Sequence, residues 1–434
     1  MIAAEVKYKK TGIEWIPEIP EHWEILKAKN IGIFDGSTVD KKIDKHEKMI
    51  RLVNYMDIYD NETFEITDVV DFMKVTATEH QIKNLRVNIG DVVFTPSSEV
   101  REDIGKSAVI KYESDDLLFS YHVLRLRFNR EIDINFKKYM FNNKPALKYF
   151  SKNCKGSTRK ILNRIDFKNL PVYLPPVEEQ QVIANYLDTQ SAKITHFIQT
   201  KQRFIELLKE QRQSIITHAV TKGIDENVKM KETVVGEIPE HWEVRRMKFL
   251  ADVYNGATPE TSIESYWDGD INWITPADFG IDKFITSSNR KITKEGLHSC
   301  ATTLVPKGSI IVSTRAPIGS LGIAEIELCT NQGCRAIVTK NIFNEFLYYF
   351  LTTQTVMLNI LGNGTTFREL STYNLKNLKI PYPAIEEQKR IVEHIKTETK
   401  TLDIAISKAE REIELIKEYR EAMIAEAVTG KMKL

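Results

Sequence analysis

The residues best suited to chemistry form a basic loop, SKNCKGSTRKILNR, at positions 151–164. The loop has no acidic residue, and its Gly-Ser-Thr centre places hydroxyl and backbone N–H groups among the cations. This combination can bind the phosphates of a nucleic acid. A solvated basic loop without a ligand has the same composition, so the sequence leaves both interpretations open. The candidate residues of this loop are Lys155, Ser157, Thr158, Arg159, Lys160 and Arg164.

Two further patterns repeat part of this chemistry. The stretch GNGTTFRELSTYNLK keeps a Gly-Thr-Thr but few cations, and it makes Thr365, Thr366 and Arg368 candidates as well. Arg101 and Arg315 each lie four residues before a glycine, between segments that resemble strands. Arginine suits both guanine edges and phosphates. An arginine at a turn is also often a salt-bridge partner, so the spacing alone does not decide its role.

Catalytic motifs are absent from the sequence. It has no GxxxxGK[ST], GxGxxG, HExxH or GxSxG pattern. The run Leu-Pro-Pro-Val at 174–177 lacks both the acid or amide and the aromatic ring that an adenine methyltransferase loop needs. The four cysteines form no CxxC pair and no zinc-binding pattern with histidine. We therefore predict a chain without catalytic residues, metal ligands or a cofactor of its own.

The composition is that of a soluble globular protein. The chain has 434 residues, of which 42% are hydrophobic, and this length predicts two to four domains. It has no apolar run of about 18 residues and no signal-peptide core at its N-terminus, so we expect a cytoplasmic protein that does not enter a membrane. With 61 basic and 60 acidic residues the net charge is +1, so any surface for nucleic acid must be local.

The chain contains an internal repeat. EIPEHWE stands at 18–24 and again at 237–243, an offset of 219 residues. FKNLPVYLPPVEEQ and LKNLKIPYPAIEEQ are 208 residues apart, and from Glu178 to Thr221 this register continues without a gap, with 17 of 44 residues identical. Each half is therefore predicted to be one copy of the same fold with a different middle segment. The histidine-tryptophan pairs are interpreted as packing elements of that fold.

Each copy is predicted to hold a mixed α/β body followed by a long helix. Short β-branched runs bounded by Gly or Pro, such as GKSAVIKY and GSIIVSTR, predict strands. After each P-x-x-E-E-Q, apolar residues recur at heptad spacing, and a helix of about 40 residues, about 60 Å long, needs a partner for this stripe. We predict that the two helices pair with each other as an antiparallel coiled coil. The seam residues are Ile194, Ile198, Ile205, Leu208, Ile215 and Ala219, and Leu402, Ile406, Ala409, Ile413, Ile416, Met423 and Ala427.

These features together resemble the specificity (S) subunit of type I DNA restriction-modification enzymes. The resemblance rests on the two IPEHWE segments, the runs GATPE and YWDGDINWIT within 256–275, RAPIG at 315–319, NQG at 331–333 and the P-x-x-E-E-Q helix openings, and it covers nearly all of the chain. The first copy departs from the pattern at two places. It has Val-Asn-Tyr-Met-Asp at 53–57 where the second has Trp-Ile-Thr-Pro-Ala-Asp, and Tyr121-His122 where the second has Asn-Gln.

The resemblance implies a fold class of α+β, with two target recognition domains in tandem, each followed by a spacer helix. We expect domains at 1–175 and 223–382 and helices at 176–222 and 383–434. The resemblance also implies a non-catalytic subunit in which each body reads one half of a split target in double-stranded DNA. The implied partners are two adenine methyltransferase (modification) subunits and ATP-dependent restriction subunits. S-adenosylmethionine, ATP and Mg are then expected on those partners only.

Two other functions are the alternatives to a specificity subunit. A coiled-coil scaffold whose bodies bind proteins, without DNA specificity, would suit the near-zero net charge. An enzyme with its own nuclease or methylase activity would need motifs that the sequence lacks. Salt-dependent DNA binding would distinguish the scaffold from the specificity subunit.

Overall fold

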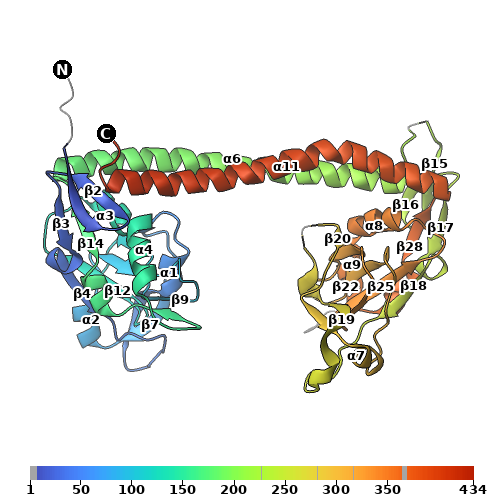
Figure 1. The fold of residues 1–434 in the computed structure, drawn as a ribbon, viewed down its shortest axis with the longest axis horizontal. Coiled ribbons are helices and arrows are strands. Elements are labelled where there is room, and N and C mark those ends of the chain that lie inside the picture. The colour runs from blue at the N-terminus through green and yellow to red at the C-terminus, as the bar shows by residue number, and fades with distance from the viewer. Residues whose placement is uncertain (1–6, 226, 281, 316, 364–368) are drawn as a thin grey trace. The chain divides into compact units, whose positions relative to one another are not determined.

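The computed structural model describes residues 7–225, 227–280, 282–315, 317–363 and 369–434 (Figure 1). The chain divides into two compact units: unit 1 comprises Met1–Lys201 with Arg411–Leu434, and unit 2 comprises Gln202–Glu410. Two long helices, α6 (Val177–Lys222) and α11 (Ile385–Val428), each contribute to both units. We call the part of the chain before α6 body 1 and the part between α6 and α11 body 2.

Body 1 contains two small sheets whose strands are short and mostly buried. The five-stranded sheet has the order β4 (Gly32–Gly36), β12 (Leu124–Phe128), β8 (Val92–Phe94), β10 (Ser107–Ile110), β6 (Glu65–Ile66). The three-stranded sheet has the order β11 (Leu117–Phe119), β5 (Lys48–Val53), β7 (Met73–Ala77). The pairs β10–β6 and β11–β5 are parallel and the other pairs in these two sheets are antiparallel.

Body 2 repeats this topology. Its five-stranded sheet has the order β18 (Ala251–Asn255), β25 (Cys334–Thr339), β22 (Ile310–Ser313), β23 (Leu321–Ala324), β20 (Phe284–Ile285). Its three-stranded sheet has the order β21 (Arg290–Ile292), β19 (Trp267–Ile274), β24 (Leu328–Thr330). The parallel pairs are again the last pair of the larger sheet, β23–β20, and one pair of the smaller sheet, β19–β24; the β19–β21 pair is antiparallel. The prediction of two mixed α/β copies of one fold is therefore confirmed.

Smaller elements complete the two bodies, and they include helices over the stretches NFKKYMFNNKPALKYF and NEFLYYFLTTQTVMLNIL. Those of body 1 are β1 (Tyr8–Ile13), β2 (Ile16–Pro20), β3 (Glu24–Lys27), α1 (Tyr55–Tyr59), α2 (Glu79–Leu85), β9 (Ser97–Ser98), α3 (Ile134–Phe141), α4 (Lys144–Asn153), β13 (Lys160–Ile161), α5 (Arg164–Lys168) and β14 (Pro171–Leu174). Those of body 2 are β15 (Met230–Thr233), β16 (Gly236–Pro239), β17 (Glu243–Arg246), α7 (Lys294–His298), α8 (Asn344–Thr353), α9 (Thr355–Leu361), β26 (Gly362–Asn363), β27 (Glu369–Leu370), α10 (Thr372–Asn377) and β28 (Lys379–Tyr382).

The apolar stripes of α6 and α11 are buried, as their heptad spacing predicts. Every predicted seam residue is buried or half-buried. In unit 1, Ile194 and Ile198 of α6 share a core cluster with Met423 and Ala427 of α11. In unit 2, the end of α6 and the start of α11 share the core of body 2. Ion pairs across the two helices join Lys201 to Glu412 at 2.6 Å, Lys209 to Glu410 at 3.2 Å and Arg212 to Asp403 at 2.7 Å.

The repeated His-Trp pair attaches each body to the first turn of the long helix that follows it. In unit 1, Trp23 is 2% exposed, and its Nε1 donates to Glu179 Oε2 at 2.9 Å. His22 Nε2 lies 2.6 Å from the other oxygen of Glu179. In unit 2, Trp242 Nε1 donates to Glu387 at 3.0 Å, with the neighbouring histidine 3.0 Å from the same carboxylate. The two repeated motifs, IPEHWE and P-x-x-E-E-Q, therefore contact each other within each copy.

The same tryptophans pack against the end of the other long helix. A side chain at Gly430, two residues beyond α11, would come within 3.2 Å of Trp23, and one at Gly223, directly after α6, would come within 3.3 Å of Trp242. Both glycines have positive φ angles, +70° and +78°, which glycine adopts without strain as a helix terminator. Each body thus contacts the start of one long helix and the end of the other, within its own unit.

A buried glutamine makes a second attachment. Gln180, 1% exposed, accepts a hydrogen bond from Asp133 N at 2.8 Å and donates from Nε2 to Pro175 O at 2.8 Å. Gln388 repeats both contacts at 2.8 Å, with the backbone ahead of α8 and ahead of α11. Because a buried amide needs partners for both its oxygen and its nitrogen, glutamine suits this position.

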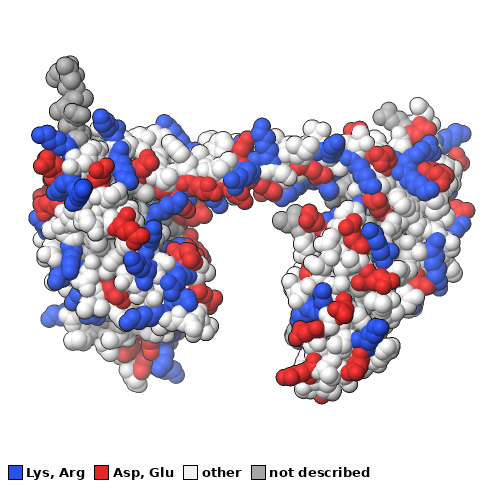
Figure 2. All heavy atoms as spheres, in the orientation of Figure 1, with Lys and Arg blue, Asp and Glu red and all other residues white. Residues whose placement is uncertain are grey.

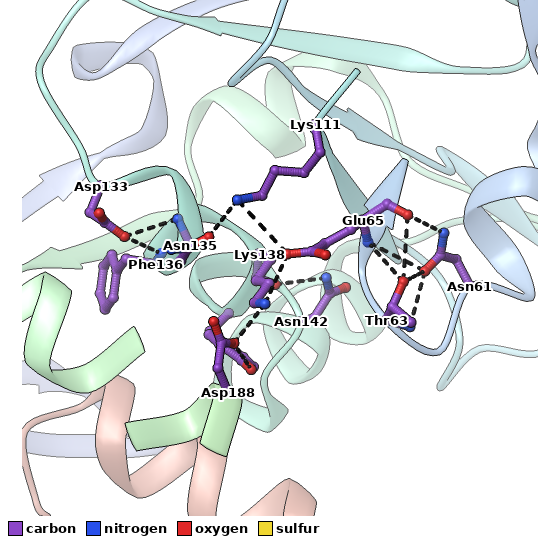
Figure 3. Close-up of polar contacts among 11 residues, drawn as sticks. Asn61, Thr63, Glu65, Lys111, Asp133, Asn135, Phe136, Lys138, Asn142 and Asp188 are labelled. Carbon is purple, nitrogen blue, oxygen red and sulfur yellow. Dashed lines mark hydrogen bonds and ion pairs between the residues drawn. The ribbon is translucent and has the colours of Figure 1, made fainter. Parts of the chain in front are cut away.

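An ion network also joins body 1 to α6 (Figure 3). Lys138 of α3 lies 2.9 Å from Glu65 of β6 and 2.6 Å from Asp188 of α6. Tyr139 donates to Asp188 at 2.6 Å, and burial raises the pKa of this tyrosine well above its ordinary value. In the pair that joins them, the helix therefore supplies the carboxylate, Asp188, and the body supplies the cation, Lys138.

Unit 2 makes the corresponding attachment with the charges reversed. Lys396 of α11, which the 208-residue register aligns with the acid of α6, lies 2.9 Å from Glu345 of α8. Lys283, just before β20, contacts the same carboxylate. Here the helix supplies the base and the body the acid, so the two attachments are not electrostatically interchangeable.

Candidate nucleic-acid interface

The ends of several strands meet along one edge of each body. In body 1, Gly36 at the end of β4 and Phe94 at the end of β8 both pair with Leu124 at the start of β12. Ser120 N donates to the backbone at the end of β5 at 3.0 Å, and the chain from Ser120 leads directly into β12, which brings the end of the second sheet to the same place. We define edge 1 as the residues at and after these strand ends together with the strand β13 that faces them. The residues at the strand ends are 36–41, 53–55, 95–98 and 120–124.

The basic loop contributes its cations to edge 1 because β13 pairs with β9. Arg159 Nε donates to Ser97 Oγ at 3.2 Å. The ammonium of Lys160 donates to the carbonyls of Gly156 and Ser157, so this lysine also holds its own turn. Lys155 forms a bridge with Ile161 and, like the Ser-Thr pair, is exposed.

Arg164 and Arg101 lie in different surroundings. Arg164 begins α5, and its Nη2 lies 3.0 Å from where a Cβ would be at Gly36, so it is next to the end of β4. Arg101 lies farther along the loop after β8, and its Nη1 donates to the carbonyl of Ser151 in α4 at 3.3 Å. The structure thus brings the basic loop and Arg164 together at edge 1, whereas Arg101 contacts α4.

Aromatic residues that no sequence motif marks as site residues occupy the same edge. The Tyr121 and His122 rings lie 3.8 Å apart, centroid to centroid. Burial, followed by the charges of Arg159 and Lys41, lowers the pKa of His122, which favours the neutral ring. Burial raises the pKa of Tyr55, with Ser98 and Arg159 opposing this. These side chains offer neutral donors and acceptors beside the cations.

Edge 2 is the corresponding set in body 2: residues 255–258, 274–276, 313–315, 330–335 and 369–372. The β ladders pair Asn255 with Arg335 and Ser313 with Cys334. Asn331 N donates to the carbonyl at the end of β19 at 2.8 Å, and the chain from Asn331 leads directly into β25, which brings the end of the smaller sheet to the same edge. Of the predicted site residues in body 2, Arg315 lies on this edge. Thr365, Thr366 and Arg368 lie outside the described residues.

An acidic residue holds two arginines at edge 2. Glu369 Oε2 lies 3.2 Å from Arg315 Nε, and Glu369 Oε1 lies 3.1 Å from Arg335 Nη2. Arg335 also donates to Thr372 Oγ1 and to the carbonyls of residues 332 and 334. Its side chain is 11% exposed, whereas that of Arg315 is 50% exposed.

The strand pairings correct two alignments made from sequence. Ser97 pairs with Ile161 as Arg315 pairs with Glu369, so the structural counterpart of Arg315 is Ser97 rather than Arg101. The error arose because the loop ending at Gly105 is four residues longer than the loop ending at 319. The two glycines do correspond, since each has a positive φ and donates its N–H back to the strand end.

The second correction concerns the departures in the first copy. Phe119 pairs with the end of β5 as Thr330 pairs with the end of β19, so Ser120 and Tyr121, rather than Tyr121 and His122, match Asn331-Gln332. At the other departure the two copies agree structurally. Asn54 N donates to Asp57 and Thr275 N donates to Asp278, each at 2.7 Å, so different residues make the same helix cap.

The surface charge is mixed. Figure 2 shows Lys and Arg interspersed with Asp and Glu on the face in view. Within the described ranges, no group of three His, Cys, Asp or Glu residues could hold a metal ion. The described helices include none that is long and apolar enough to cross a membrane. Contacts with nucleic acid would therefore depend on local groups such as those of edges 1 and 2.

Comparison with known proteins identifies the family. A family model described as the type I restriction modification DNA specificity domain matches residues 20–207 and again residues 239–415. These matches cover most of the chain, which therefore belongs to this family and carries its domain twice. Proteins of this family provide DNA specificity rather than catalysis, and the hypothesis of a scaffold without DNA specificity is not favoured.

Several relatives agree with this assignment. The chain is 28% identical over 445 residues to the putative type I restriction enzyme MjaX specificity subunit of Methanocaldococcus jannaschii, covering 99% of this chain and 97% of that protein. It is 43% identical over 166 residues to the MjaIX specificity subunit of the same organism, covering 37% of this chain and 38% of the relative. The fold is shared with a chain from a structural study of the assembly and conformational transition of a type I restriction-modification system, with a TM-score of 0.70 at 18% identity, covering 95% of this chain and 99% of that one.

Proposed function

We propose that this protein is the specificity subunit of a type I restriction-modification complex, in which body 1 and body 2 each read one part of a split, asymmetric DNA target. The observation that carries the proposal is the pair of edges. Both have the same strand topology, yet Ser97, Ile161 and Leu124 of edge 1 correspond to Arg315, Glu369 and Arg335 of edge 2. One scaffold with two sets of side chains suits two different base sequences.

In this proposal, residues 1–175 and 223–382 are the target recognition domains, and residues 176–222 and 383–434 are spacer helices. The spacer is an antiparallel coiled coil along the full length of α6 and α11. The ion pairs support this direction, because residue 209 of α6 contacts residue 410 while residue 212 contacts residue 403. The coiled coil would set the length of the unread gap between the two parts of the target.

The partners follow from the same proposal. Two modification subunits, each an S-adenosylmethionine-dependent adenine methyltransferase, assemble on the specificity subunit, and ATP- and Mg-dependent restriction subunits join them. The complex acts on double-stranded DNA in the cytoplasm. We expect that the purified chain alone neither methylates nor cuts DNA, and a methyl transfer by the isolated chain would refute the proposal.

The proposed contacts of edge 1 divide by chemistry. The exposed cations and hydroxyls of the basic loop bind phosphates, which positions the body without selecting bases. The aromatic side chains face base edges. At edge 2, Arg315 is the proposed contact. Arg101, Thr365, Thr366 and Arg368 stay predictions. The phosphate contacts proposed for edge 1 are Lys155, Ser157, Thr158, Arg159, Lys160 and Arg164.

The decisive experiment maps methylation. The chain is expressed with its modification subunits in a host that lacks adenine methylation, and the methylated sites are sequenced. We expect a split, non-palindromic motif, and replacement of body 1 by that of a relative should change one part of the motif only. A motif in which both parts change would contradict independent reading by the two bodies.

A charge experiment tests the phosphate contacts. Replacing residues 155, 159 and 160 by alanine should weaken binding to every DNA sequence and reduce the slope of log K against log salt by about 0.9 for each lost phosphate contact. The matched control removes three exposed lysines of body 1 that lie outside the edge, Lys10, Lys27 and Lys29. If both triple variants change the slope equally, the basic loop has no special role.

A further inference from the structure

We propose that Glu369 is a positioning residue for base recognition: it orients Arg315 so that body 2 selects a guanine in its part of the target. The inference rests on the proposed function. It adds a residue that no sequence motif indicates. An acid on a DNA-binding edge opposes phosphate binding. Its role must therefore be sought in what it does to the neighbouring arginines.

The contact geometry leaves the base-reading side of Arg315 open. A guanidinium has five N–H donors, and Glu369 takes the one on Nε at 3.2 Å. Among the described residues, none accepts a hydrogen bond from the two Nη atoms of Arg315. The pair of terminal nitrogens is the fork that matches O6 and N7 of guanine in the major groove. An acceptor on Nε fixes the plane of the guanidinium and leaves the donors of both Nη atoms available.

Glu369 is itself fixed from behind. Its other oxygen accepts from Arg335, a guanidinium that is held at three further points by Thr372 Oγ1 and two backbone carbonyls. The backbone of Glu369 also forms an antiparallel bridge with Arg315, and Leu370 N donates to Thr314 O at 2.9 Å. The carboxylate therefore has little freedom to follow a moving arginine. Such second-layer support is what holds a binding group in a productive geometry.

Edge 1 shows the same place without this device. Ile161 stands where Glu369 stands, Leu124 where Arg335 stands and Ser97 where Arg315 stands. A guanidinium still reaches the position, but it comes from the opposite strand: Arg159 Nε donates to the neutral hydroxyl of Ser97. With no carboxylate of the described residues paired to it, Arg159 keeps an uncompensated charge, which suits a phosphate. The inference is thus specific to body 2.

The charge balance points the same way. Arg315, Arg335 and Glu369 together carry one net positive charge, and the carboxylate lies against both guanidinium groups. A phosphate approaching Arg315 would meet this carboxylate, whereas the neutral edge of a guanine would not be repelled. Glu369 therefore discriminates between the two ligands that an arginine can bind.

The test uses the full chain assembled with its methyltransferase subunits and duplexes that carry the mapped target. Each base pair in the part read by body 2 is substituted in turn, and competition binding gives the discrimination at each position. We expect Arg315→Ala to reduce discrimination for one guanine by roughly 5- to 150-fold, the range of a bidentate contact. Glu369→Gln should reduce it at the same guanine by about tenfold or more and should strengthen binding to unrelated DNA.

A double-variant cycle shows whether Glu369 acts through Arg315. In the Arg315→Ala background, Glu369→Gln should cause no further loss of discrimination, because the residue that it positions is gone. Arg315→Lys keeps the charge but not the fork, so it should lose the guanine preference and retain affinity for unrelated DNA. Glu243→Gln is the matched control, since Glu243 pairs with Arg245 on β17, away from edge 2. It should leave discrimination unchanged.

The outcomes separate the inference from the function beneath it. A uniform loss of affinity for all sequences in Arg315→Ala would mean a phosphate contact and would overturn the inference. So would an equal effect of Glu369→Gln with and without Arg315. If the parental complex showed no preference for the mapped target, the proposed function itself would fail.

Discussion

The contact between Trp23 and Glu179 gives a prediction whose size follows from the structure. In Glu179→Ala, the indole N–H loses its acceptor while the ring stays 2% exposed. An unsatisfied buried donor costs about 1–3 kcal/mol. The contact with His22 is exposed, and its contribution of about 0–1 kcal/mol lies within the width of this range. We therefore expect the joint between body 1 and α6 to lose about 1–3 kcal/mol of its opening free energy.

Hydrogen exchange measures this loss locally, which is needed because a chain with two units does not unfold in one step. Amides of β2 and of the first turns of α6 should exchange roughly 5- to 150-fold faster in Glu179→Ala, while unit 2 stays unchanged. Glu387→Ala should instead accelerate exchange in the corresponding part of unit 2 and leave unit 1 unchanged, because Glu387 makes the equivalent contact in unit 2.

The control is Glu178→Ala. Glu178 is exposed in the same first turn, so its removal costs the same helix-dipole interaction, about 0.3–1 kcal/mol, without touching the tryptophan. If Glu179→Ala accelerated exchange no more than Glu178→Ala, the repeated motif would not be the attachment that the geometry indicates.

Three further predictions concern the spacer, the ion network and pH. Inserting four residues after Lys201 and after Ala409, at matching heptad positions, should lengthen the gap in the methylated motif and keep the bases on either side; an unchanged gap would exclude the helices as the spacer. Lys138→Met leaves Asp188 without its cation and Glu65 with only its 3.9 Å contact to Lys111, and it should destabilise unit 1 by about 1.5–3 kcal/mol in denaturant unfolding, whereas the exposed Lys48→Met should cost about 1 kcal/mol or less. Because burial and nearby cations lower the pKa of His122 below 6.5, the unfolded chain takes up its proton first as the pH falls, so stability declines below about pH 6.5. His122→Gln should make this decline smaller between pH 7.5 and 5.5 in thermal unfolding. If the variant and the parental protein had the same pH dependence, the lowered pKa of His122 would not be its cause.

Part of the candidate site could be predicted from composition alone. The basic loop was selected because cations, hydroxyls and a glycine occur together, and the structure brings it to the strand-end edge through the β13–β9 pairing. Arg101 was selected by its spacing from Gly105, but this spacing does not align it with Arg315, because the intervening loop has a different length in the two copies. Glu369 and Arg335 were missed because neither carries a motif. Their relevance comes from contacts between distant segments: Glu369 contacts Arg315 across 54 residues of chain, and Arg335 contacts Glu369 across 34.

The sequence by itself determined the duplication, the long helices and the mixed bodies. Identical residues record a repeat directly, and heptad spacing is a local property that a helix must follow. Tertiary structure decided which strand ends share an edge, because register depends on hydrogen bonds between strands far apart in the chain. It also decided the roles of the repeated motifs: EHW and EEQ are 156 residues apart in the first copy, and only folding makes Glu179 the acceptor for Trp23. For the same reason only the fold shows that Arg315 corresponds to Ser97, since a ladder position, unlike a count of residues, is unaffected by loop length.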